Sequence, residues 1–279
     1  MPGLDDVVEE GWAVVATDYT GLGTPGPHPY LIGAGEGHSV LDSLRAARQL
    51  EGLRLAPETV VWGHSQGGHA ALWAGQLAST YAPELEVVGI AAVSPAADVP
   101  ALAANLPDAT LGELFSSYVL AAYASHYPDI TLEEQVIPPA RTLVREIADR
   151  CLAEPSILAS LASVLSVARD RSVYAVPPAE GPLGARLREN VPTGPFTAPV
   201  LVAQGEADSL VLPHVQQDYV DGLCGAGESV DYRVYSGRNH LDIVESGSAL
   251  VPDLLAWTGT RFGDEAVEVA NRTARSCSP

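Results

Sequence analysis

A serine between two glycines is the part of this sequence most suited to covalent chemistry. The segment Gly63-His64-Ser65-Gln66-Gly67 follows an apolar run and precedes a helical pattern, and it has the form G-x-S-x-G. This pattern places a serine on a strained turn between a strand and a helix, where neighbours two positions away must be small. Gly63 and Gly67 meet that requirement, so we predict that Ser65 is a nucleophile.

The residues beside Ser65 also have expected roles. The backbone N–H of Gln66, the residue after the serine, is predicted to donate to an oxyanion at the start of the following helix. His64 is adjacent to the nucleophile in the turn and therefore points elsewhere, so it cannot serve as the base. We interpret His64 and His69 either as packing residues or as residues that support the site by contacting its members.

An acidic residue is expected after Ser65 in the chain, in the loop that follows the next-to-last strand. The run 199–203 predicts that strand, and Glu206 and Asp208 compete for the position after it. We choose Asp208 because a buried course resumes at residues 210–213, and we interpret Glu206 as a surface charge.

A histidine is expected last, after the final strand. His240 follows the predicted strand 230–235, which sets it apart from the other histidines of the chain. We predict that His240 takes the proton of Ser65 and later protonates the leaving alcohol. Asp208 would hold the tautomer of His240 and stabilise its imidazolium form.

Alternating strands and helices must position these residues. Short apolar runs predict buried strands at residues 12–17, 59–62, 86–93, 199–203 and 230–235. Helical patterns lie between them, notably at 37–50 and 66–81. This alternation predicts an α/β fold with a mostly parallel sheet, helices on both faces and ligands at the carboxyl ends of the strands.

The stretch 100–190 interrupts the alternation with short helical segments separated by prolines. We expect a helical cap there, inserted into a core formed by 1–99 and 191–279, although simple helical packing is the alternative. The candidate substrate-binding residues are Tyr19 and, in the cap, Phe115, Tyr118 and Tyr123, with core packing as the alternative for the cap aromatics.

Composition excludes several classes of protein. The chain has 15 Lys plus Arg against 35 Asp plus Glu, a net charge of −20, which disfavours binding to nucleic acids and anionic membranes. No signal peptide and no membrane-spanning run is recognisable. No zinc-type Cys/His cluster and no nucleotide-binding loop occurs, so we expect no metal and no cofactor.

The chain resembles the secretory lipase family (Candida antarctica lipase A-like) in its actinobacterial type. The resemblance covers nearly the whole chain, and it rests on the segments 18–23, 41–46, 63–68, 81–85, 205–208 and 239–241. It implies an α/β-hydrolase fold with a helical cap, a lipase or carboxylesterase acting on small-molecule esters or lipids, and secretion. It also implies a disulfide between Cys224 and Cys277, with Cys151 left as a free thiol.

The resemblance has one departure, at the N-terminus. Family members carry about a hundred further residues there, which form the first strands and supply the second oxyanion donor. We therefore expect those first strands to be missing and strand 12–17 to be an exposed sheet edge, which favours a homo-oligomer. We also expect the oxyanion hole to be incomplete or rebuilt by the loop 21–26.

Three functions remain open from the sequence. The leading one is a serine carboxylic ester hydrolase working through an acyl-enzyme. The second uses the same site to move acyl groups from esters to alcohols in water. The third is a hydrolase-fold protein that has lost activity and only binds ligands or partners.

Overall fold

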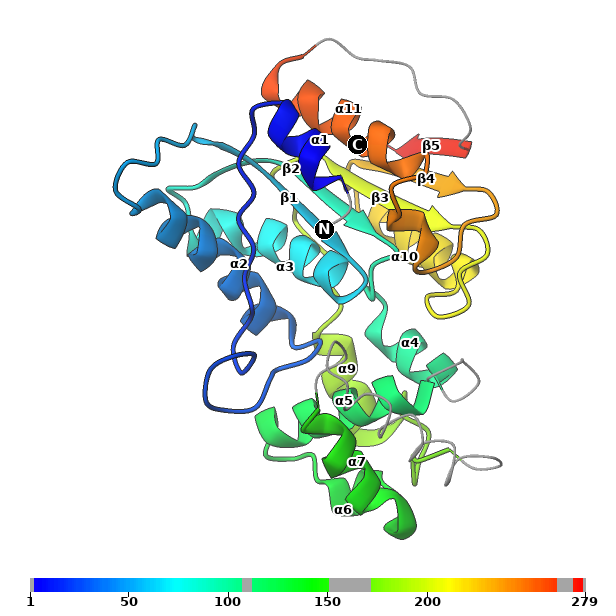
Figure 1. Cartoon of the computed structure of the whole chain (residues 1–279). Helices are drawn as coiled ribbons and strands as arrows, with labels where there is room; N and C mark the ends of the chain where they lie inside the picture. Colours follow the sequence, from blue (N-terminus) through cyan, green and yellow to red (C-terminus); the bar gives the residue numbers. More distant parts are fainter. Residues whose placement is uncertain (1–2, 107–111, 151–171, 265–272, 278–279) are drawn as a thin grey trace. The chain divides into compact units, whose positions relative to one another are not determined.

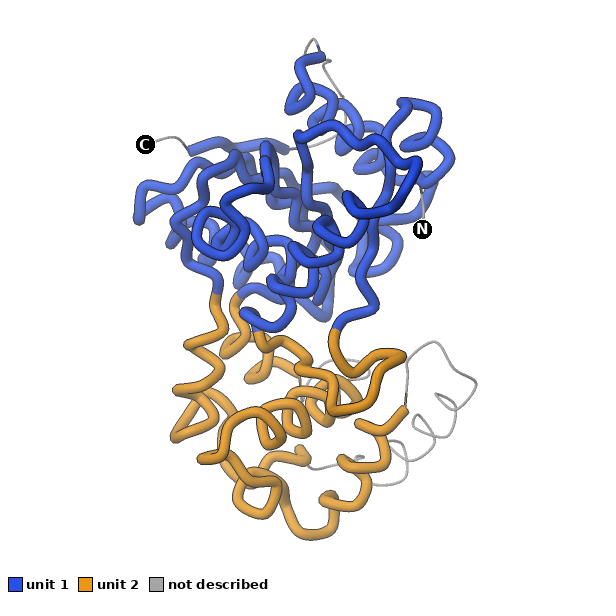
Figure 2. Tube along the Cα trace, turned by 90° about the vertical axis from the view of Figure 1, so that its left-hand side faces the viewer, with its two compact units in different colours: residues 1–19, 33–97, 192–279 blue, residues 20–32, 98–191 orange. Residues whose placement is uncertain are grey.

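The structure is a computed structural model that describes residues 3–106, 112–150, 172–264 and 273–277. The chain forms two compact units. Unit 1 comprises residues 1–19, 33–97 and 192–279, and unit 2 comprises residues 20–32 and 98–191 (Figure 2). Cys151 and the free thiol predicted for it lie outside the described residues.

Unit 1 is built on a sheet of five strands in the order β1-β2-β3-β4-β5 (Figure 1). The strands are β1 (Glu58–His64), β2 (Glu86–Val93), β3 (Val200–Gly205), β4 (Val230–Tyr235) and β5 (Thr273–Cys277). Neighbours from β1 to β4 are parallel, and β5 is antiparallel to β4. The predicted strands at 59–62, 86–93, 199–203 and 230–235 are confirmed, as is the α/β class.

Among the described helices of unit 1, two precede β1 in the chain and the others each follow a strand. The helices are α1 (Leu4–Glu9), α2 (Gly33–Arg48), α3 (Gln66–Tyr81), α10 (Pro213–Gly225) and α11 (Leu250–Phe262), with a 3-10 turn η3 (Asp242–Val244) before α11. Ala91, Val93 and Leu201 pack with Trp257 of α11 on one face of the sheet. Ile90 faces the other way, toward Gly75 of α3, so helices cover both faces.

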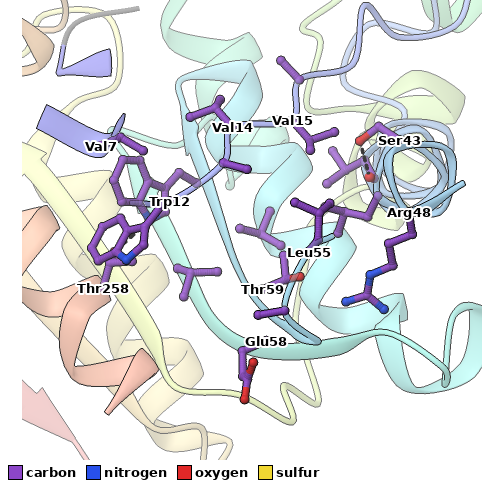
Figure 3. Close-up of a pocket in the computed structure, with 18 of the residues that line it drawn as sticks. Val7, Trp12, Val14, Val15, Ser43, Arg48, Leu55, Glu58, Thr59 and Thr258 are labelled. Atoms are coloured by element: carbon purple, nitrogen blue, oxygen red, sulfur yellow. Dashed lines mark hydrogen bonds between the residues drawn. The ribbon is translucent and has the colours of Figure 1, made fainter. Parts of the chain in front are cut away.

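One predicted strand is wrong. Residues 12–17 form no ladder with any strand in the described part of the chain, and Val14 is 43% exposed. A strand is held by hydrogen bonds to a neighbour. Instead, a cavity of about 750 Å³ is lined by this run on one side and by β1 residues such as Thr59 on the other (Figure 3). The run is apolar, as predicted, but no described strand pairs with it.

The edge of the described sheet is therefore β1, which pairs with β2 alone. In Figure 3, the cavity is bordered by Val14 and Val15 of the extended run, by Leu55 just before β1 and by Thr59 within β1. An open parallel edge still invites pairing with another chain. The homo-oligomer expected from an exposed strand at residues 12–17 remains a prediction, although those residues form no edge strand in the described part of the chain.

Unit 2 is helical. It holds α4 (Val99–Asn105), α5 (Gly112–His126), α6 (Leu132–Gln135), η2 (Pro138–Ala140), α7 (Arg141–Ala148) and α9 (Gly181–Glu189). Residues 20–32 belong with these helices rather than with the sheet, unlike in the division expected from the sequence. Leu31 is fully buried there, and its carbonyl accepts a hydrogen bond of 2.9 Å from the Tyr123 hydroxyl.

Candidate active site

Ser65 lies on a sharp turn between the end of β1 and the start of α3. Its φ of 57° and ψ of −117° are rare for a residue with a side chain. The turn is held by hydrogen bonds from Ser65 N–H to the Val93 carbonyl (2.9 Å) and from Ala96 N–H to the Ser65 carbonyl (3.1 Å). These bonds to β2 and the segment after it keep the strained serine in place.

The glycines around Ser65 contribute unequally to this turn. A Cβ at Gly63 would lie 1.7 Å from the Gly67 carbonyl oxygen, and one at Gly68 would lie 2.9 Å from Pro95. A Cβ at Gly67 would meet only the Tyr19 hydroxyl, at 4.0 Å. The steric requirement expected at Gly63 is confirmed, whereas the one expected at Gly67 is wrong because that position opens away from the turn.

Two loops at the carboxyl ends of β3 and β4 bring the acid and the histidine together. The loop after β3 is tied to the loop after β4 by hydrogen bonds from Glu206 N–H to the Tyr235 carbonyl (3.0 Å) and from Ala207 N–H to the Arg238 carbonyl (2.8 Å). Asp208 and His240 follow these ties directly, so the backbone pairing sets how close their side chains lie.

The side chains of Ser65, His240 and Asp208 form a continuous hydrogen-bonded series. His240 Nε2 lies 2.9 Å from Ser65 Oγ, and His240 Nδ1 lies 2.8 Å from Asp208 Oδ2. His240 is 9% exposed and Asp208 is 3% exposed, so water has little access to the pair. The structure thus brings together the three residues selected from the sequence.

The environment of Asp208 keeps it ionised. Burial raises the pKa of its carboxyl, but the hydrogen bond and charge of His240 and the N–H groups of Leu210 and Val211 outweigh burial and lower that pKa. Both N–H groups reach Oδ1 at 2.9 Å. An ionised Asp208 accepts a hydrogen bond from the Nδ1–H of His240, so the ring proton stays on Nδ1. The Nε2 atom is then the acceptor that faces Ser65.

Glu206, the competing acid, is exposed and accepts hydrogen bonds from Ser236 Oγ (2.5 Å) and Gly237 N–H (3.2 Å). Its contacts tie one loop to the other. The interpretation of Glu206 as a loop charge therefore agrees with these contacts.

His64 contacts the backbone of His240, which agrees with the interpretation of His64 as a residue that supports the site. Its Nε2 lies 2.7 Å from the carbonyl oxygen of His240, and the centroids of the two imidazole rings are 4.8 Å apart. Burial, followed by the nearby His240, lowers the pKa of His64 to about 4. His64 is therefore neutral near pH 7, and its Nε2–H donates to the backbone of His240.

Gln66 is the first residue of α3, so its N–H belongs to the helix turn whose amides lack partners within the helix. Its side chain donates to Glu36 Oε1 at 2.8 Å, and Glu36 also lies 2.6 Å from His69 Nδ1. Sequence reasoning missed Glu36. The only local sign of it was the pair Gly33 and Gly37, which predicts a close helix contact but no particular partner.

The other candidate residues have mixed outcomes. Tyr19 is half-buried in unit 1, and its hydroxyl lies beside Gly67. Phe115, Tyr118 and Tyr123 lie on α5 in unit 2, and Tyr123 is fully buried. A substrate-binding role for these aromatic residues remains a prediction.

The loop 21–26 also belongs to unit 2, and at Gly21 its conformation depends on glycine. Gly21 has a φ of 81°, and a Cβ there would lie 2.6 Å from the His28 backbone nitrogen. Its N–H donates to Thr24 Oγ1 at 3.0 Å. The tight turn explains the glycine, and an oxyanion role of the loop remains a prediction.

A disulfide joins Cys224 and Cys277, as the family resemblance implied. Cys277 is paired with Val230 at the start of β4, so the bond holds β5 at the end of the strand opposite to His240. Within the described residues, no group of three or more His, Cys, Asp or Glu side chains is placed to hold a metal ion.

Comparisons with known proteins place this geometry in a family. A model of the secretory lipase family matches residues 3–269. A probable inactive lipase of Mycobacterium tuberculosis is 28% identical over 93% of this chain and 57% of its own length. Lipase A of Moesziomyces aphidis is 25% identical over 88% of this chain and 54% of its own length. The chain spans little more than half the length of these relatives.

Solved structures share the fold. Candida antarctica lipase A is 21% identical and superposes with a TM-score of 0.68, over 87% of this chain and 57% of that one. The rice cell wall degrading esterase of Xanthomonas oryzae gives 0.68 at 21% identity, over 88% of this chain and 68% of that one. With this fold and with the family model matched over residues 3–269, the chain belongs to the secretory lipase family and has the α/β-hydrolase fold.

Proposed function

We propose that this protein is a serine carboxylic ester hydrolase, a lipase or esterase that works through an acyl-enzyme. The observation that carries the proposal is the series Ser65–His240–Asp208, with 2.9 Å and 2.8 Å between its polar atoms. A strained serine facing an acceptor imidazole that a carboxylate orients is the arrangement used for nucleophilic acyl transfer.

The proposed reaction has two halves. As Ser65 Oγ bonds to the ester carbonyl carbon, its proton passes to His240 Nε2, and the Gln66 N–H donates to the carbonyl oxygen as it becomes an oxyanion. The carbon–alkoxy bond then breaks, and His240 returns the proton to the leaving alcohol. Water, deprotonated by His240, releases the acid from Ser65 in the second half.

The substrate and the location of the protein follow from the family. We propose an ester or lipid substrate and a secreted protein, because the matched family and the relatives compared are lipases and the family is secretory. Among the described residues no helix combines the length and the apolar character that a membrane span needs.

Two alternatives share this site. Acyl transfer differs only in that an alcohol replaces water in the second half of the reaction. A binding protein without activity is suggested by the name of the Mycobacterium tuberculosis relative, a probable inactive lipase. Against that alternative stands the Ser65–His240 contact, because a protein that only binds does not need a serine hydroxyl aimed at an imidazole.

A fluorophosphonate probe tests the proposal, since it labels only an activated serine. We expect stoichiometric labelling of the wild type and hydrolysis of short p-nitrophenyl esters, with both lost in Ser65→Ala. Ser79→Ala, which changes an exposed serine of the helix α3 that follows Ser65, is the matched control and should be labelled like the wild type. Labelling that persists in Ser65→Ala, or a wild type that neither reacts nor hydrolyses, would contradict the proposal. The ratio of ester to acid formed in buffer with added alcohol separates transfer from hydrolysis.

A further inference from the structure

A second carboxylate is buried next to the turn that holds Ser65, here called the nucleophile turn, and the reaction proposed above does not use it. Glu36 lies in the first turn of α2, and its side chain is fully buried. Its two oxygens accept from different residues of α3, namely Oε1 from Gln66 Nε2 at 2.8 Å and Oε2 from His69 Nδ1 at 2.6 Å. Both donors belong to the first turn of the helix that begins after Ser65.

The hydrogen bonds around His69 determine which of its two ring nitrogens carries the proton. The indole Nε1–H of Trp73 lies 3.1 Å from His69 Nε2. An indole nitrogen can only donate, so Nε2 must accept and the ring proton must be on Nδ1. His69 is therefore a neutral donor to Glu36, with both of its nitrogens engaged and no position left for moving a proton.

Two glycines let the helices approach closely enough for these contacts. A Cβ at Gly33 would lie 2.0 Å from the ring of Trp73, and one at Gly37 would lie 3.0 Å from the Trp73 backbone. Without side chains at these positions, α2 packs directly against α3. This packing brings Glu36, between the two glycines, to the first turn of α3.

A buried carboxylate is costly unless hydrogen bonds satisfy it, and an apolar side chain is usually the cheaper solution at such a position. Gln66 and His69 are three positions apart and lie on one face of the helix. Tyr19 lies beside the same turn, where burial and the charge of Glu36 raise the pKa of its phenol. The carboxylate thus fixes the turn that supplies the amide next to Ser65.

We propose that Glu36 is a positioning residue, which holds the first turn of α3 so that the Gln66 N–H lies where the oxyanion forms. The inference rests on the proposed ester hydrolase activity. An amide at position 36 carries no charge and has one acceptor oxygen in place of two, so Glu36→Gln should weaken the bonds that hold Gln66 and His69.

Steady-state kinetics with active-site titration test this role. A displacement of about 1 Å in a catalytic group can cost about 10²-fold in rate, so Glu36→Gln should lower kcat by about 10- to 100-fold with KM within about 2-fold. A trifluoromethyl ketone, whose oxyanion occupies the same position, should bind more weakly by a similar factor. Asp42→Asn, an exposed carboxylate of the same helix, should leave kcat unchanged.

A second variant protects the test against misfolding of the first. Gln66→Met keeps the backbone N–H and the length of the side chain but removes its donor to Glu36. It should lower kcat in the same way, and the double variant should lose less than the product of the two single losses. An unchanged kcat per titrated site in both variants, independent losses in the double variant, or a rise in KM alone would overturn the inference. A wild type without activity would instead mean that the proposed function fails.

Discussion

Two buried carboxylate–imidazole pairs lie next to the nucleophile turn, and they differ in one contact. In the first, His240 Nδ1 lies 2.8 Å from Asp208, and in the second, His69 Nδ1 lies 2.6 Å from Glu36. The remaining nitrogen of His240 faces the Ser65 hydroxyl at 2.9 Å. The remaining nitrogen of His69 instead accepts from the Trp73 indole at 3.1 Å.

This contact decides what each pair can do. A serine hydroxyl gives up its proton as the oxygen attacks a carbonyl carbon, so an acceptor nitrogen facing it can act as a base. An indole N–H keeps its proton near pH 7. An imidazole nitrogen that accepts from an indole, as that of His69 does, therefore receives no proton and is only held in position. Both pairs join a carboxylate to an imidazole, and we propose a base in the first pair and a positioning contact in the second.

The largest expected effect is on the first pair. Asp208→Asn keeps the shape of the side chain but favours the wrong tautomer of His240, because the new amide can donate toward Nδ1. We expect kcat to fall by about 10⁴-fold, measured with a p-nitrophenyl ester. Glu206→Gln, two positions earlier and bonded to Ser236 instead, is the matched control and should retain the wild-type rate. Loss of rate in Glu206→Gln with activity left in Asp208→Asn would exchange the two assignments.

If the rate losses of the variants at the site arise locally, a loss of stability elsewhere in the fold should leave the rate unchanged. Removing the disulfide tests this expectation. Cys224 and Cys277 are 53 positions apart, so their bond stabilises the fold by about 4 kcal/mol in the chain-entropy account. The double variant Cys224→Ser/Cys277→Ser should lose about that much free energy of unfolding in urea, with kcat per titrated site within about 2-fold. A large fall in kcat would show that the site depends on global stability.

The smallest effect concerns His64, which braces the first pair through the His240 carbonyl. Burial and the adjacent His240 lower the pKa of His64 to about 4 in the folded protein, below the ordinary value of 6.5. The unfolded chain thus binds a proton that the folded one does not between these values. The stability that the fold gains from holding His64 neutral is therefore complete above about pH 6.5, and it is lost as the pH falls toward 4.

His64→Gln keeps a donor for the carbonyl but cannot titrate. We expect the variant to lose less free energy of unfolding than the wild type between pH 7 and pH 4.5, as measured by urea titration at both values. An equal loss in the two proteins would assign the acid sensitivity in this pH range to groups other than His64.

The parts predicted well from the sequence depend on local patterns. The runs at 86–93 and 230–235 and the helix at 66–81 coincide with β2, β4 and α3, because each pattern lies within its own element. The order of Ser65, Asp208 and His240 was predictable, since each residue follows a recognisable strand. Residues 12–17 show the limit of this reasoning, because a strand also needs a neighbour that the run itself does not encode.

The contacts of Glu36 could not be predicted from the sequence for a related reason. Gln66 and His69 lie about thirty positions away in the chain, and nothing in their sequence neighbourhood indicates that a carboxylate lies against them. The two glycines at 33 and 37 indicated a close helix approach but not the helix approached. The contact of His64 with the His240 carbonyl is likewise made between two loops that only the folded sheet brings together.

The sequence by itself determined that a serine sits between a strand and a helix and that an acid and a histidine follow later strands. These features depend on residues within one turn or one strand. Only the tertiary structure decided which carboxylate meets which imidazole and what faces the second nitrogen of each ring. Those outcomes depend on how parallel strands and helices distant in the chain pack against one another, and packing of this kind has no local signature.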